Sequence, residues 1–203
     1  MIIHQIYYDD KSKSNCIIDD RVKLYYNIID PNPFYENEVI CDLIPLEQSD
    51  RVGVFSHKYT NKLGISLDRI EERTEDIVTF FKINYKNHYW KNFDRWHPNG
   101  LKALEELKIV FGWDIDFNKQ PKHIVYQNHF VADTNIYKHY VKTFLKPVMN
   151  YLLLNDHLVN FEPRLPQYKG YTMHPFLLER LFTIYLEQNK YSVHQFNILY
   201  EKD

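Results

Sequence analysis

Residues 173–186 read MHPFLLERLFTIYL, a nearly continuous apolar run that encloses one adjacent charged pair, Glu179 and Arg180. Pro175 suits the first turn of a helix, because that position needs no backbone N–H donor. Apolar side chains leave little polar surface for a solvated face, so we expect this helix to be buried. A buried carboxylate and guanidinium are costly unless they are paired or bound to a ligand. The pair is therefore either an internal clamp or part of a site.

Segments with strand character alternate with helical segments along the rest of the chain. The predicted strands occupy residues 2–7, 51–56, 77–81 and part of 122–132. The predicted helices occupy residues 34–44, 67–70, 101–110 and two segments between Asp133 and Leu154. Residues 9–15 have loop composition, residues 31–33 form a turn, and residues 191–200 are either a last strand or an irregular tail. This order predicts one α/β domain over residues 1–203, with a mainly parallel sheet flanked by helices.

Composition excludes several classes of protein. The net charge of −2 lacks the basic excess of a dedicated nucleic-acid binder, although it leaves DNA open as a substrate. No apolar run approaches the roughly 20 residues that span a bilayer, and the start lacks the pattern of a secretory signal. We therefore expect a soluble, cytoplasmic protein without a transmembrane segment. Cys16 and Cys41 offer neither a metal-binding spacing nor a disulfide framework.

Common catalytic motifs are missing from the sequence. The five glycines are too scattered for a phosphate-binding loop or a dinucleotide fingerprint. No His-Glu-x-x-His helix or Gly-x-Ser-x-Gly elbow is present, which argues against a zinc protease and a serine hydrolase. The 17 Tyr and 13 Phe are dispersed along the chain, so we expect them mainly in the core.

Four further segments carry a family resemblance. They are MIIHQIY at residues 1–7, DRVGVFSHKY at 50–59, KLGIS at 62–66 and YQNHFVA at 126–132. In this order, and with the helix that follows His174, they resemble glycosyltransferase-like proteins encoded in bacterial polysaccharide clusters. The resemblance implies a GT-A-like fold that binds a nucleotide-sugar donor and transfers the sugar to a hydroxyl acceptor, such as a polysaccharide or another glycan.

The donor site is expected at the carboxyl ends of the strands, because ligands of open α/β sheets bind there. Lys58 and Lys62 could contact a diphosphate, although a surface lysine is the preferred interpretation of each. Gly53 indicates a close backbone approach to a neighbour or a ligand, and Arg180 could contact phosphate or orient Glu179. The remaining predicted donor-binding residues are His4, Gln5, Tyr7, Ser56, His57, Asn128 and His129.

Three carboxylates are candidates for the base that takes the acceptor proton: Glu179, Asp116 and Asp133. Related enzymes often hold Mg²⁺ or Mn²⁺ with an Asp-x-Asp motif, and Asp114 and Asp116 have that spacing. Alternation along a strand would point both carboxylates to one face. However, the family pattern expects the motif after the second strand, where the sequence reads Phe55-Ser56-His57. An exposed turn is therefore the preferred interpretation of Asp114 and Asp116.

Two alternatives remain open from the sequence. A small glycosyltransferase could modify hydroxylated bases of viral DNA, in which case nucleic acid would be the acceptor substrate. The chain could also be a non-catalytic binding or assembly module that keeps the fold. Convergent polar residues around a deep pocket would favour an enzyme, whereas a filled cleft or a large apolar patch would favour the module.

Overall fold

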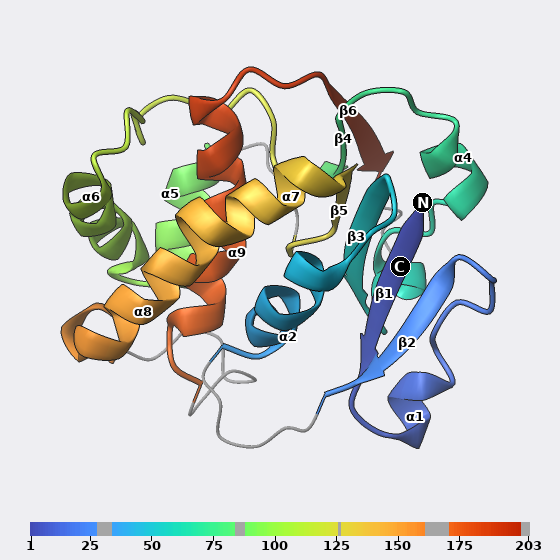
Figure 1. Ribbon diagram of the computed structural model, residues 1–203. Helices are drawn as coiled ribbons and strands as arrows, with labels where there is room; N and C mark the ends of the chain where they lie inside the picture. The colour runs from blue at the N-terminus through green and yellow to red at the C-terminus, as the bar shows by residue number, and fades with distance from the viewer. Residues whose placement is uncertain (28–33, 84–87, 126, 161–170, 200–203) are drawn as a thin grey trace.

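The computed structural model describes residues 1–27, 34–83, 88–125, 127–160 and 171–199, and within these residues six strands form one sheet (Figure 1). The strand order is β2-β1-β3-β5-β4-β6. Neighbouring strands are parallel except where β5 pairs with β3 and β4. The strands are β1 Ile2–Tyr7, β2 Val22–Tyr26, β3 Arg51–Ser56, β4 Ile77–Ile83, β5 Phe130–Asp133 and β6 Val193–Leu199. The prediction of an α/β domain with a mainly parallel sheet is confirmed.

Short and long helices connect the strands. The α-helices are α1 Asp10–Lys13, α2 Glu36–Leu43, α3 Tyr59–Lys62, α4 Leu67–Glu71, α5 Tyr89–Trp96, α6 Gly100–Phe111, α7 Thr134–Tyr140, α8 Lys146–Leu154 and α9 His174–Gln188. Two 3₁₀ turns are η1 Ile44–Leu46 and η3 Asp156–Leu158, and the π-helical η2 Val141–Leu145 joins α7 to α8. Asp133 caps α7 through the backbone N–H groups of Asn135 and Ile136, as its position predicted.

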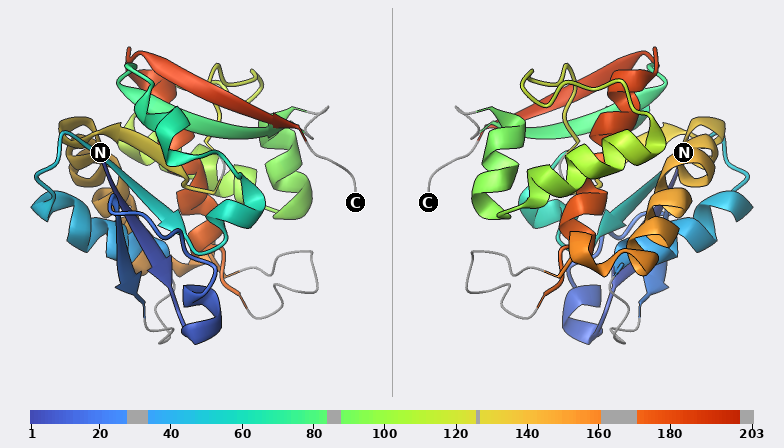
Figure 2. Two further views of the ribbon diagram at one scale, coloured as in Figure 1. Left: turned by 90° about the vertical axis from the view of Figure 1, so that its right-hand side faces the viewer. Right: turned by 90° about the vertical axis from the view of Figure 1, so that its left-hand side faces the viewer.

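The sheet has a hydrophobic core on each face, because side chains of a strand alternate in direction. Val52 and Val54 of β3 point into the larger core, which α2 and α5 to α9 cover. Phe55 points into the smaller core, which lies under α3 and α4. The two views in Figure 2 show these helix layers from opposite sides. Helix α9 crosses the larger core, and Leu181 and Phe182 are fully buried within it, so the predicted burial of this helix is confirmed.

Several local predictions were wrong. Residues 9–15 are not all loop, because Asp9 and Ser12 form a capping box that starts α1. The strand predicted within residues 122–132 is restricted to β5 and runs antiparallel to β3. Strand β2 and helix α5 were not predicted. Of the two alternatives for residues 191–200, the last strand is confirmed, because β6 lies within them. The turn predicted at residues 31–33 lies outside the described residues. Among those that are described, no helix is long and apolar enough to cross a membrane.

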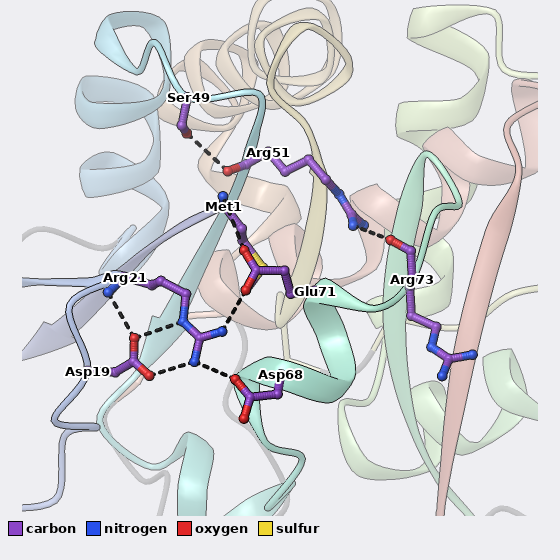
Figure 3. A network of polar contacts seen from close by, with 8 residues as sticks. All are labelled: Met1, Asp19, Arg21, Ser49, Arg51, Asp68, Glu71 and Arg73. Atoms are coloured by element: carbon purple, nitrogen blue, oxygen red, sulfur yellow. Dashed lines mark hydrogen bonds and ion pairs between the residues drawn. The ribbon is translucent and has the colours of Figure 1, made fainter.

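A network of charged side chains ties the start of the sheet to α4 (Figure 3). The Arg21 guanidinium contacts Asp19 at 2.6 Å, Glu71 at 2.7 Å and Asp68 at 2.8 Å. The amino nitrogen of Met1 lies 3.8 Å from Glu71. One guanidinium thus connects the segment before β2 to both acidic residues of α4, and β1 reaches the same helix through Met1. The network holds α4 against the sheet near the amino ends of β1 and β2.

Gly53 sits in the middle of β3, where it allows neighbouring strands to approach closely. A Cβ at this position would lie 2.9 Å from Ile3 Cδ1, 2.9 Å from Val131 Cγ2 and 3.0 Å from the Phe130 carbonyl oxygen. The close approach predicted for this glycine is therefore to neighbouring strands. We expect Gly53→Ala to lower the free energy of unfolding by about 1–3 kcal/mol, as overpacked cores do. Urea unfolding measures this loss; unchanged stability together with lost donor binding would instead support a ligand contact.

Candidate functional site

A cavity of about 390 Å³ opens at the carboxyl ends of β1 and β3. Its walls come from α2, α3, α5, α9 and the segment that precedes β5. It gathers seven of the residues that were predicted for the site, namely Ser56, Lys58, Lys62, Asn128, His129, Glu179 and Arg180. The remaining wall is largely aromatic and amide. The cavity therefore combines polar groups of both charges with apolar surface, as small-molecule sites do.

The antiparallel direction of β5 brings His129 to the end of β3. The His129 Nε2 atom accepts a hydrogen bond from the Ser56 backbone N–H at 3.2 Å. Since the backbone group can only donate, Nε2 must be unprotonated and the ring proton must lie on Nδ1. Burial, with a smaller effect from Lys62, lowers the pKa of His129 to about 3. His129 is thus a neutral ring that holds the Ser56 end of β3 in place.

A strained turn precedes His129. Gln127 and Asn128 both adopt positive φ values, 52° and 58°, which non-glycine residues rarely do. The Lys62 ammonium donates to the Gln127 amide oxygen, and the Asn128 amide nitrogen donates to Asn37 Oδ1 at 3.1 Å. These two bonds link the turn to α3 and to α2, on either side of the cavity. Backbone strain that is held by its surroundings is typical of functional sites.

Glu179 and Arg180 lie on α9, one turn after Pro175. Their carboxylate and guanidinium are 3.7 Å apart, and both side chains line the cavity with exposed fractions of 24% and 12%. Burial raises the pKa of Glu179, while the charges of Arg180 and Lys62 act in the opposite direction. The Arg180 guanidinium also lies 4.8 Å from the ring centre of Phe93. The pair is therefore an ion pair and a part of the cavity wall at once.

Glu36, in the first turn of α2, adds a second carboxylate to the cavity. Its charge contributes to the raised pKa of Glu179. The Tyr8 hydroxyl donates a hydrogen bond to the Glu36 carboxylate. Burial, and in addition the charge of Glu36, raises the pKa of Tyr8. This contact connects the loop after β1 to the cavity wall. Glu36 was not predicted from the sequence.

Two predicted donor-binding residues of β1 lie outside the cavity, and one of them supports it. Gln5 is fully buried, and its amide donates to the Ser56 carbonyl at 3.1 Å while accepting from the Ile17 N–H at 2.8 Å. It therefore fixes the end of β3. The ring of His4 instead bonds Glu47 at 2.7 Å on the flank of the sheet. His4 therefore does not line the cavity.

The other predicted residues that miss the cavity have structural contacts of their own. The ring of Tyr7 contacts Tyr26 and the ammonium of Lys13, and the ring of His57 packs against Tyr8. Gly53 is enclosed between strands. Asp133 caps α7 at the opposite end of β5, where its register pairs it with Arg51. None of these four predicted residues lines the cavity.

Asp114 and Asp116 also lie outside the cavity. Burial alternates from Trp113 to Phe117, and both carboxylates are exposed, just before a turn at residues 117–118. The predicted exposure of Asp114 and Asp116 is therefore confirmed. Asp116 accepts the Asn118 N–H at 3.0 Å and lies 3.6 Å from the Lys119 ammonium. Across the described part of the chain, no three His, Cys, Asp or Glu side chains cluster in a way that fits a metal ion. Asp114 and Asp116 therefore do not supply a Mg²⁺ or Mn²⁺ site to the cavity.

Much of the aromatic wall was missed because α5 was not predicted. Tyr89, Trp90, Phe93 and Trp96 follow helical spacing, and this signal could have revealed the helix. The cavity residues that the sequence did not single out include Tyr35, Asn37, Asn92, Trp96, His97 and Phe176.

Comparison of the chain with protein-family models, curated proteins and solved structures gave no match.

Proposed function

We propose that the protein is a cytoplasmic glycosyltransferase that moves a sugar from a nucleotide-sugar donor to a hydroxyl acceptor, such as a glycan. The observation that supports this most is the cavity at the carboxyl ends of parallel strands, in which Lys58, Lys62 and Arg180 converge with Glu179. An α/β sheet binds ligands at this edge. Cationic groups suit a diphosphate, and a buried carboxylate suits proton transfer.

The donor diphosphate is assigned to the wall formed by α3 and the end of β3. Lys58 and Lys62 extend from α3 or its start, and the Ser56 hydroxyl lies beside them. In our proposal the two ammonium groups stabilise the charge that develops on the departing nucleoside diphosphate. Lys62 also holds the Gln127 side chain, so its position is fixed before a ligand arrives.

Glu179 is assigned as the general base. The acceptor oxygen bonds to the anomeric carbon of the sugar, the bond from that carbon to the diphosphate breaks, and the acceptor proton passes to Glu179. A carboxylate whose pKa is raised by burial accepts a proton more readily than an exposed one. Arg180, 3.7 Å away, orients this carboxylate.

A second candidate is a binding module that keeps the fold without catalysis. The position of Asp114 and Asp116 outside the cavity favours it, since a metal motif would support transfer. Thermal unfolding with a panel of nucleotide sugars and free nucleoside diphosphates, each with and without Mn²⁺, tests the donor site. Donor at about a hundred times its dissociation constant should add about 2.7 kcal/mol of stability, or roughly 5–10 °C for a chain of this size.

The Lys58→Ala variant tests the assigned wall. We expect it to weaken donor binding by about tenfold, because a charge-assisted contact to phosphate is lost. Lys142→Ala is the matched control, since Lys142 is exposed on η2 and does not line the cavity. If no member of the panel raises the unfolding temperature, the proposal of a glycosyltransferase is refuted and the binding module becomes the better candidate.

A further inference from the structure

Three aromatic side chains from separate segments stand at the rim of the cavity. Tyr35 precedes α2, Trp96 ends α5 and Tyr171 lies just before α9. The rings of Tyr35 and Tyr171 stack at 5.7 Å with an angle of 11°. Trp96 and Tyr171 keep 40% and 42% of their surface exposed although they line the cavity. Large exposed rings beside a polar cavity form a surface on which a flat ligand can stack.

Polar groups line the same cavity as these three rings. His97 stacks on Phe176, with ring centres 4.1 Å apart, and its buried Nδ1 atom has no hydrogen-bond partner among the described residues. A buried polar atom without a partner is costly, so this atom favours a ligand that can bond to it. The amide of Asn92 and the carboxylate of Glu36 line the same cavity. The Asn92 amide oxygen and the Glu36 carboxylate can accept hydrogen bonds from the hydroxyl groups of a ligand.

We propose that the aromatic rim of Tyr35, Trp96 and Tyr171 is the acceptor subsite and that it takes a neutral oligosaccharide. A sugar ring presents an apolar C–H face to an aromatic side chain and hydroxyl groups at its edge. The rim contacts the apolar C–H face, and His97, Asn92 and Glu36 bond to the hydroxyl groups. The assignment to an acceptor rests on the proposed function, whereas binding of the oligosaccharide does not.

The charge of the rim favours a glycan over a nucleic acid. A nucleobase can also stack on aromatic rings, but its phosphodiester backbone needs basic side chains along its path. Glu36 would repel such a backbone, and Lys58 and Lys62 belong to the α3 wall that we assign to the donor. Arg95, whose guanidinium lies 5.4 Å from the ring of Trp96, is a basic group near the rim. An oligonucleotide is therefore a necessary arm of the test.

Tryptophan fluorescence gives a direct readout, because Trp90 and Trp113 are buried and Trp96 is the exposed member of the three. The probes are neutral tri- to hexasaccharides of glucose, galactose and N-acetylglucosamine, with hexathymidylate as the nucleic-acid arm. We expect at least one oligosaccharide to protect Trp96 from acrylamide quenching. Tyr171→Ala should weaken that binding by about tenfold or more, as truncation of a central aromatic contact does.

Tyr26→Ala is the matched control, since Tyr26 is a half-exposed tyrosine on β2 that does not line the cavity. It should leave oligosaccharide binding unchanged, and Tyr171→Ala should leave the thermal shift by the donor unchanged. Protection by hexathymidylate alone, or by none of the probes, would overturn the inference even if a donor binds. Protection by an oligosaccharide without any donor shift would uphold the subsite while refuting the glycosyltransferase.

Discussion

Glu179→Gln is expected to slow sugar transfer by about two to four orders of magnitude, the usual contribution of a general base. The amide has nearly the same shape as the carboxylate but cannot accept the proton of the acceptor. Glu179 sits in the cavity wall with a raised pKa, 3.7 Å from Arg180, so the substitution changes charge without opening space. Release of nucleoside diphosphate and of glycosylated product, measured with the donor identified by thermal unfolding, gives the rate.

Asp116→Asn and Asp133→Asn are the matched controls, because both carboxylates were candidates for the same role. Asp116 faces solvent, and Asp133 caps α7 at the far end of β5. Asparagine is also a good N-cap, so neither change should unfold the chain. We expect both variants to transfer sugar at the wild-type rate. A Glu179→Gln variant that retains full activity, or an Asp133→Asn variant that loses it, would remove Glu179 from the mechanism.

The affinity for the donor and the pH dependence of the rate show whether Glu179 acts as a base or only supports the structure. Glu179→Gln should bind the donor at least as tightly as the wild type, since it removes a negative charge from a cavity that holds a diphosphate. The wild-type rate should rise with pH as Glu179 loses its proton, above the usual carboxyl pKa of 4.5 because burial shifts it upward. The residual rate of the variant should lack this rise. Weaker donor binding in the variant would instead indicate a misfolded cavity wall.

The sequence predicts the strands that form the site better than the residues that face it. The apolar runs of β1 and β3 are recognisable, and their carboxyl ends locate the cavity. Within a strand, however, neighbouring side chains point to opposite faces, and the direction depends on which helices cover each face. His4 bonds Glu47 on the flank of the sheet, and Gly53 is enclosed between strands, so neither lines the cavity. Ser56 ends β3 and Lys58 follows it, and both side chains line the cavity.

Tertiary contacts decide the rest of the site. His129 reaches Ser56 only because β5 runs antiparallel in an otherwise parallel sheet, and nothing in the local sequence fixes that direction. The aromatic wall depends on α5, whose spacing is recognisable although its location beside α9 is not. Glu179 was found because a charged pair in an apolar helix is a local anomaly. Local anomalies can be read from a sequence, whereas neighbours in space cannot.

The largest effect on stability should come from two buried histidines as the pH is lowered. Burial lowers the pKa of His97 and of His129 to about 3 each, with contributions from Arg180 and Lys62 respectively. In the unfolded chain both rings take up a proton near pH 6.5. Between these pH values the unfolded state binds more protons, so stability is full above pH 6.5 and is lost as the pH falls. The loss at pH 4.5 is about 2–3 kcal/mol for each ring, roughly 5 kcal/mol in total.

Urea unfolding at pH values from 7.5 to 4.5 measures this dependence. His4, His57, His123 and His174 also have a lowered pKa and act in the same direction. The raised pKa of Glu179 opposes them near pH 4.5. His129→Gln retains an acceptor for the Ser56 N–H, and it should reduce the slope between pH 5 and 6 by about 1.4 kcal/mol per pH unit.

The slope is the decisive quantity, because any loss of packing in His129→Gln lowers stability equally at every pH. His97→Gln should reduce the slope by a similar amount, and the two effects should add, since neither replacement titrates. An unchanged slope in His129→Gln would mean that the ring takes up a proton in the folded protein. That result would contradict the neutral Nδ1-protonated ring and, with it, the way in which β5 holds the end of β3 at the cavity.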